Sequence, residues 1–164
     1  MTCVLPQLRE LLESEGLRYY LIPDQEGVML TMRGAEGKYQ FKILLELENE
    51  FLQFRSIDYL HCPQGHPHLD ATLQILGEAN YRLRLMKFGW DPTDGEIAAY
   101  ADLWIADAEI TQGQFSRMAN GFMSILDDEY PRIQKAIESG VGPEDPEDEE
   151  DEEDGEDQDL VDSL

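Results

Sequence analysis

The segment from His61 to His68 gathers all three histidines and one of the two cysteines of the 164-residue chain. Thiolate and imidazole are ligands that zinc prefers, so Cys62, His66 and His68 are the candidate metal ligands. Their spacing lacks the paired C-x₂-C and H-x₃₋₅-H pattern of a structural zinc site, and two prolines stiffen the segment. The pattern therefore favours a loop that leads into a helix. It leaves open, as the alternative function, a regulator that senses a metal or small ligand through residues 61–68.

Other motifs with known chemistry do not fit the sequence. Counting back from Gly95, the acidic positions of a calcium-binding EF-hand loop fall on Trp90, Pro92 and Asp94. No glycine run matches a phosphate-binding loop, and no serine has the flanking glycines of a nucleophile elbow. No pair of carboxylates stands out for acid–base catalysis. We therefore predict a protein that is not an enzyme and needs no bound cofactor.

A predicted β-hairpin between Asn80 and Ile105 carries residue types that protein interfaces concentrate. Asp94-Gly95 is its turn signal, because glycine adopts positive φ without steric cost and aspartate tolerates it. The return strand alternates from residue 96 to 105, which places one of its faces in a core. On the outgoing strand, we expect Leu83 and Leu85 to share that core face. The opposite face is predicted to bind a protein partner through Arg82, Arg84, Phe88, Trp90, Tyr100 and Trp104. The alternative is that a helix of the same domain covers this face.

The other elements are read from apolar periodicity. Leucines at helical spacing predict a helix that starts at Leu5 and is ended by Gly16. A second helix is predicted from apolar residues at 69–79, with Pro67 at its first position. Thr111 opens the last helix with a capping box, and Pro131 is expected to kink or interrupt it. Alternation predicts strands over residues 19–22, 28–32, 39–47 and 51–57. The predicted fold is α+β, an antiparallel sheet with three helices in the order α-β-β-β(-β)-α-β-β-α.

Charge divides the chain into two parts. Residues 141–164 contain 14 of the 36 acidic residues and none of the 12 basic ones, so residues 1–140 still carry a formal charge of −10. An acidic domain argues against nucleic acid and anionic membranes as partners. We predict a folded domain over residues 1–140 and a disordered acidic tail over residues 141–164, because the tail cannot bury enough apolar surface to offset its ordering entropy. Apolar residues return at 160–164, where a short docking motif is the alternative to a plain chain end.

The sequence lacks three features that would indicate a membrane or secreted protein. No apolar run approaches the roughly 20 residues of a transmembrane helix. The first ten residues lack the basic and apolar regions of a signal peptide. Cys3 and Cys62 do not make a disulfide framework. We therefore expect a cytoplasmic protein.

Short motifs in the hairpin and after it resemble the YbjN-like family, whose members share the type III secretion chaperone-like fold. They are Asn80, Asp91, Asp94-Gly95-Glu96-Ile97, Ile110-Thr111 and Phe115. By element order, the resemblance extends over residues 17–137. It implies a non-catalytic module, often dimeric, that acts as a regulator or chaperone.

Relatives in photosynthetic bacteria include an assembly chaperone for carboxysome shell proteins. The resemblance therefore leads us to expect an assembly or folding chaperone, or an adaptor, that holds a segment of another protein. The candidate partners are a carboxysome shell protein and a second copy of the chain. The family brings no catalytic residues to this sequence.

Overall fold

The structure of the chain, a computed structural model, describes residues 4–106 and 109–143. Three helices and seven strands follow one another in this part of the chain. The predicted α+β class and the order of the helices are confirmed. Cys3 and residues 144–164 of the predicted tail lie outside the described residues.

The three helices lie where they are predicted, although the second begins at Leu69 and not at Pro67, and two of the strands are very short. The helices are α1 (Leu5–Ser14), α2 (Leu69–Arg82) and α3 (Gln112–Ser139). The strands are β1 (Tyr19–Leu21), β2 (Gly27–Arg33), β3 (Lys38–Glu46), β4 (Phe51–Ile57), β5 (Leu60–His61), β6 (Met86–Trp90) and β7 (Glu96–Trp104).

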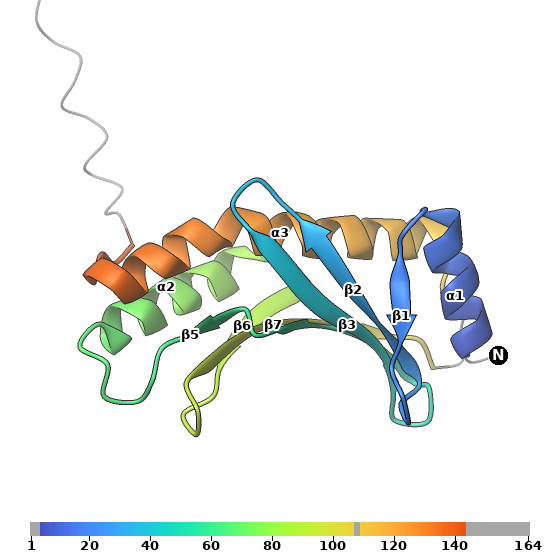
Figure 1. The fold of residues 1–164 in the computed structure, drawn as a ribbon, viewed down its shortest axis with the longest axis horizontal. Coiled ribbons are helices and arrows are strands. Elements are labelled where there is room, and N and C mark those ends of the chain that lie inside the picture. Colours follow the sequence, from blue (N-terminus) through green and yellow to red (C-terminus); the bar gives the residue numbers. More distant parts are fainter. Residues whose placement is uncertain (1–3, 107–108, 144–164) are drawn as a thin grey trace, which may run out of the picture.

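All strand pairs are antiparallel, and the sheet runs in the order β1-β2-β3-β4-β7, with β6 on the far side of β7. The two-residue β5, which the sequence did not predict, continues beside β7 where β4 ends. The three helices lie on one face of the sheet, and the sheet curves so that its other face is open and concave (Figure 1). Each strand therefore has one face toward the helices and one face uncovered.

Alternate strand residues and the apolar stripe of α3 form the core. Phe41, Ile43 and Phe54 are fully buried on the helix side of the sheet, opposite Phe115 and Phe122 of α3. The ring centroids of Phe54 and Phe122 are 5.6 Å apart, within the range of favourable aromatic pairs. The period-two and period-3.6 patterns of the sequence therefore identify these core positions correctly.

The N-terminus of α3 follows the predicted chemistry, and the helix runs on through Pro131. The capping box is confirmed, since the Thr111 hydroxyl accepts from the Gln114 N–H and the Gln114 side chain accepts from the Thr111 N–H. Of the predicted kink or interruption at Pro131, the interruption is wrong, because α3 continues through Pro131 to Ser139. A proline removes only one backbone hydrogen bond, and the buried side chain of Ile133 helps to hold the following turn against the core.

Candidate functional site

The predicted partner-binding residues do not share one face, because the first strand of the hairpin begins later than expected. Helix α2 extends to Arg82, and β6 starts only at Met86. Between them, Leu85 adopts a positive φ of 62° and is 76% exposed. This left-handed residue resets the alternation, so Met86 and Phe88 face the core, where they are 5% and 4% exposed. The predictions that Leu85 faces the core and that Phe88 lies on the partner face are wrong.

Arg82 lies on α2 instead of the hairpin, and it belongs to an ion-pair network between α2 and α3. It contacts Glu78 at 2.9 Å and the buried Glu129 at 2.7 Å, while Arg132 contacts the same two carboxylates at 2.8 and 2.9 Å. Hydrogen bonds from Arg82, and then from Arg132, lower the pKa of Glu78. The network joins the two helices, which accounts for Arg82 without a partner protein.

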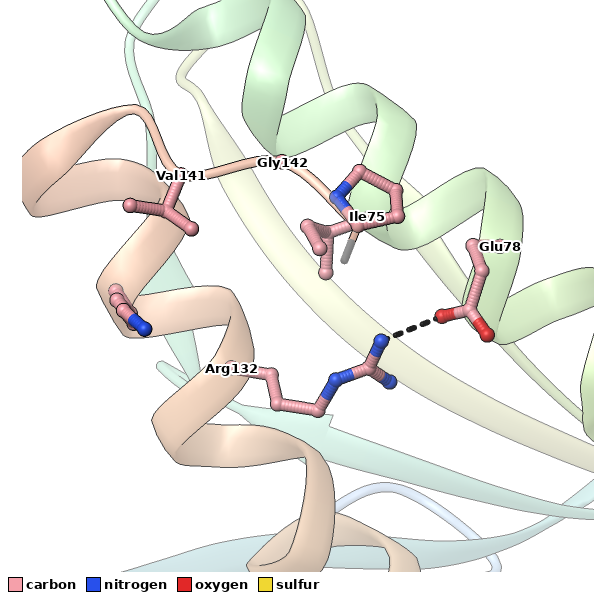
Figure 2. Close-up of a pocket in the computed structure, with 7 residues that line it drawn as sticks. Ile75, Glu78, Arg132, Val141 and Gly142 are labelled. Atoms are coloured by element: carbon pink, nitrogen blue, oxygen red, sulfur yellow. Dashed lines mark hydrogen bonds and ion pairs between the residues drawn. The ribbon is translucent and has the colours of Figure 1, made fainter. Parts of the chain in front are cut away.

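A cavity of about 190 Å³ adjoins this network where the chain leaves α3. Figure 2 shows Val141 and Gly142 beside Ile75 of α2, with Arg132 bound to Glu78 below them. The two charged side chains labelled there are therefore already paired with each other. We regard this cavity as a junction between the helices, and we do not assign it as a binding site.

The candidate metal ligands have other partners. The thiol of buried Cys62 contacts the Thr72 hydroxyl at 3.7 Å, and Nδ1 of His68 lies 2.8 Å from the Ile137 carbonyl oxygen. His66 accepts a hydrogen bond from the His68 N–H. Within residues 4–106 and 109–143, no three His, Cys, Asp or Glu side chains lie together as a metal site.

The half-buried Trp90 also turns toward the 61–68 loop and away from a surface partner. Its Nε1–H donates to the Cys62 carbonyl oxygen at 2.8 Å. The backbone of the same loop packs on the hairpin turn, because the Cys62 N–H donates to the Gly95 carbonyl. Trp90 therefore anchors the loop to the hairpin.

Tyr100 and Trp104 are the predicted residues that do lie on the uncovered face of the sheet. The Arg55 guanidinium lies 5.1 Å from the centre of the Tyr100 ring and pairs with Glu96 at 3.2 Å. Trp104 packs edge-on against Phe51 with 4.4 Å between ring centroids, yet 61% of it is exposed. Trp104 thus presents an exposed aromatic ring on this face, at the end of β7.

Strand β7 continues to Trp104, beyond the part that pairs with β6. The last pair with β6 is Met86↔Ala101, so β6 provides no partner for the three remaining residues of β7. The Ile105 N–H bonds the Glu50 carbonyl on the β4 side. Because backbone groups alternate along a strand, those of Trp104 face the opposite, free edge. This short edge can accept another extended segment.

An apolar groove adjoins that free edge on the helix side of the sheet. Its cavity volume is about 310 Å³, and its lining comes from the α2–β6 connection, β6, β7 and α3. We name it the β7 groove; its lining residues are Arg84, Leu85, Met86, Ala101, Leu103, Gln114, Arg117, Met118, Gly121, Phe122 and Ile125. Exposed apolar surface of this kind is typical of sites that bind another chain.

The charge of the β7 groove is opposite to that of the domain. Its lining contains Arg84 and Arg117 but no acidic residue, although residues 1–140 carry a formal charge of −10. Neither arginine forms an ion pair with another described residue. The groove therefore combines an apolar floor with two available cations, which suits an apolar segment that also carries carboxylates.

Of the predicted partner-binding residues, Arg84 lines this groove. Trp104 lies at the adjacent end of β7 with its ring on the opposite face, and the floor of the groove was not predicted. Residues such as Leu103 and Met118 are far apart in the sequence and look like ordinary core positions. One signal was present: residues 112–126 contain no acidic side chain in a chain where 36 of 164 residues are acidic. A helix face free of acids in such a chain indicates a surface with a separate role.

Comparisons with known proteins agree on the fold. The YbjN family model, described as "Putative bacterial sensory transduction regulator", matches residues 5–135. The crystal structure of YbjN from E. coli has a TM-score of 0.58 at 13% identity, covering 82% of this chain and 95% of that chain. No curated protein matches the sequence.

Two solved complexes are also similar in structure. The ExsC–ExsE complex gives a TM-score of 0.53 at 18% identity and covers 81% of this chain and 97% of that chain. The HopA1–SchA chaperone–effector complex gives a TM-score of 0.50 at 12% identity and covers 74% of this chain and 88% of that chain. At these identities, the likeness shows a common fold.

Among the described residues, no helix is long and apolar enough to cross a membrane.

Proposed function

This chain belongs to the YbjN family, and from that membership we propose that it is a non-catalytic protein-binding module, a chaperone or adaptor that holds an extended segment of a partner protein. The fold neighbours support the proposal, since one of them is a chaperone bound to its effector. We extend that protein-binding role to this chain. The family membership and the shared fold are those that the short motifs between Asn80 and Phe115 predicted.

The observation that carries the proposal is the free end of β7 beside the β7 groove. A segment laid along this edge would form backbone hydrogen bonds with Trp104, as in recognition by strand addition. Its alternate side chains would enter the groove between Met86, Leu103 and Met118. Backbone pairing would supply affinity, and the apolar floor would select the sequence.

The chemistry of the groove defines the partner segment. Arg84 and Arg117 would pair with carboxylates on the segment, while the floor takes its apolar side chains. We therefore propose an extended segment that mixes aliphatic and acidic residues. The exposed ring of Trp104, and Tyr100 four residues before it on the same face of β7, would contact the partner on the other face of the sheet.

The family resemblance suggests more specific features of this function. We propose a carboxysome shell protein as the first partner to test, a homodimer as the working oligomeric state, and the cytoplasm as the location. These proposals rest on the resemblance and on the acidic composition of the chain.

A photo-crosslinking amino acid at Leu85 tests the binding function. Leu85 lines the groove and is 76% exposed; the control is the same crosslinker at Leu47, which is 66% exposed but lies in the β3–β4 turn. We expect Leu85 to crosslink one protein in native lysate, or an added shell protein, at a single aliphatic and acidic segment. Equal crosslinking from Leu47, or none from Leu85, would contradict the proposal.

A further inference from the structure

We propose that residues 159–164 of this chain, Asp-Leu-Val-Asp-Ser-Leu, bind in the β7 groove and compete there with the partner segment. The inference rests on the proposed function in one respect, namely that the groove binds peptide segments. It names an occupant from within the chain, and it assigns the acidic region a regulatory role.

Residues 159–164 are chemically complementary to the β7 groove. The segment offers three aliphatic side chains, from Leu160, Val161 and Leu164, to a floor of leucine, methionine, phenylalanine and isoleucine. Asp159 and Asp162 flank these residues and supply carboxylates for the two arginines of the groove, which have no other ion-pair partner among the described residues. The segment therefore matches both the apolar and the charged features of the groove.

Residues 159–164 differ in composition from the acidic run before them. Residues 144–158 contain 12 acidic residues and no large apolar residue, so they cannot fill an apolar groove. The domain itself carries a formal charge of −10 and repels such a run over most of its surface. Only residues 159–164 combine acids with aliphatic side chains in the sequence after Pro143.

The chain after Pro143 is long enough for residues 159–164 to reach the β7 groove. Along α3, the rise from Gly121 in the groove to Gly140 at the helix end is about 29 Å. Seventeen residues lead from Pro143 to Leu160, and a chain of that length spans at most about 58 Å, with a random-coil distance of roughly 20–25 Å. The segment can therefore reach the groove of its own molecule without any change in the domain.

Tethering gives a weak contact a measurable effect. A linker of this length sets an effective concentration on the order of 1 mM. A segment that binds with a Kd of about 100 µM would then occupy most of the grooves and weaken partner binding about tenfold. Residues 159–164 would thus act as an intramolecular competitor that a true partner must displace.

Methionine methyl NMR of the full chain tests the inference. Met86 and Met118 line the groove, whereas Met29 and Met32 lie on β2 and serve as internal controls. The test variant carries Leu160→Ser, Val161→Ser and Leu164→Ser, which keeps charge and length. We expect the Met86 and Met118 signals to shift in this variant at every protein concentration, while the β2 signals stay in place. Unchanged groove signals, or a shift that vanishes on dilution, would overturn the inference.

Adding back the segment makes the test specific. A synthetic peptide of residues 156–164 should return the Met86 and Met118 signals of the serine variant to their original positions. The effect should be lost when Arg84→Glu and Arg117→Glu are added, and it should persist with Arg33→Glu, a cation outside the groove. No response to the peptide, or an equal loss with Arg33→Glu, would contradict the inference.

Different results would contradict the inference about residues 159–164 and the proposed binding function. If the serine variant leaves the methionine signals unchanged while Leu85 still crosslinks a partner, the inference about residues 159–164 is wrong and the binding function stands. If the peptide binds and Leu85 crosslinks no other protein, the binding function is wrong instead.

Discussion

The side chain of Asn80 pairs with both backbone groups of Phe88. Its Oδ1 accepts from the Phe88 N–H at 2.7 Å, and its Nδ2 donates to the Phe88 carbonyl at 2.9 Å. One side chain on α2 thus takes the place of a neighbouring strand and closes the outer edge of β6. The edge that remains available belongs to β7, at the residues that follow its last pair with β6, Met86↔Ala101.

Removing the Asn80 contacts should destabilise the fold. Asn80→Ala leaves the backbone N–H and carbonyl of Phe88 without these partners, and we expect a loss of about 1–3 kcal/mol of unfolding free energy. Chemical denaturation measures it, with Asn120→Ala on the exposed face of α3 as the control. Equal stability of the two variants would show that Asn80 does not hold this edge.

Alanine substitutions at Phe88 and Trp104 should affect different properties, namely stability at Phe88 and partner binding at Trp104. Phe88→Ala opens a cavity in the core and should cost about 3–5 kcal/mol. Trp104→Ala removes an exposed ring that packs on Phe51, so it should cost about 1 kcal/mol and weaken partner binding. Denaturation and binding measured on both variants check this. A severe loss of stability in Trp104→Ala would place that ring in the core.

Gly121 allows the groove to be filled without damage to the helix. A Cβ at Gly121 would meet no atom within 4 Å, and the residue lies in the middle of α3 and lines the groove. Gly121→Leu should keep or raise stability by roughly 0.5–1 kcal/mol, since glycine is a poor helix former, while it reduces binding of the partner segment at least tenfold.

Gly77 provides the matched control for this substitution. It also lies in a helix with nothing within 4 Å of its Cβ position, but on α2 and outside the groove. Gly77→Leu should change stability to a similar extent and leave binding unchanged. Equal binding by both leucine variants would argue against the groove as the site.

The sequence predicted the long periodic elements and missed the features that depend on single backbone angles. Alternation over β3 and β7 and the apolar stripe of α3 were sufficient to locate the core. Leu83 and Leu85 look like strand residues, and nothing in a leucine side chain signals the positive φ that Leu85 adopts. That one residue changed the face of Phe88. The acid-free run over residues 112–126 marked one wall of the groove, but the groove itself joins residues of β7 and α3 that only the fold brings together.

Asp127 should make stability depend on pH. Its carboxylate accepts from the N–H groups of Ala35 and Glu36 and from the Tyr39 hydroxyl, at 2.7, 3.0 and 2.8 Å. Burial alone would raise the pKa of Asp127, but these hydrogen bonds outweigh it and lower the pKa. The stabilisation is therefore present above the unfolded pKa of about 3.9 and is lost as the pH falls toward the folded value.

Asp127→Asn removes this dependence. We expect the variant to be less stable than the original protein at pH 7, with a difference that narrows below about pH 4. Denaturation curves at pH 7, 5 and 3 measure it. A difference that stays constant over this range would mean that the charge of Asp127 has no part in holding the β2–β3 turn.

Hydrogen exchange at the Trp104 amide is the most direct test of binding at the free end of β7. The measurement uses the full chain with and without a saturating synthetic copy of the segment that crosslinks to Leu85. Strand addition predicts that exchange of the Trp104 amide slows at least tenfold, because its N–H faces the free edge and gains a backbone acceptor. Unchanged exchange at Trp104 in the saturated complex would contradict binding by strand addition at this edge.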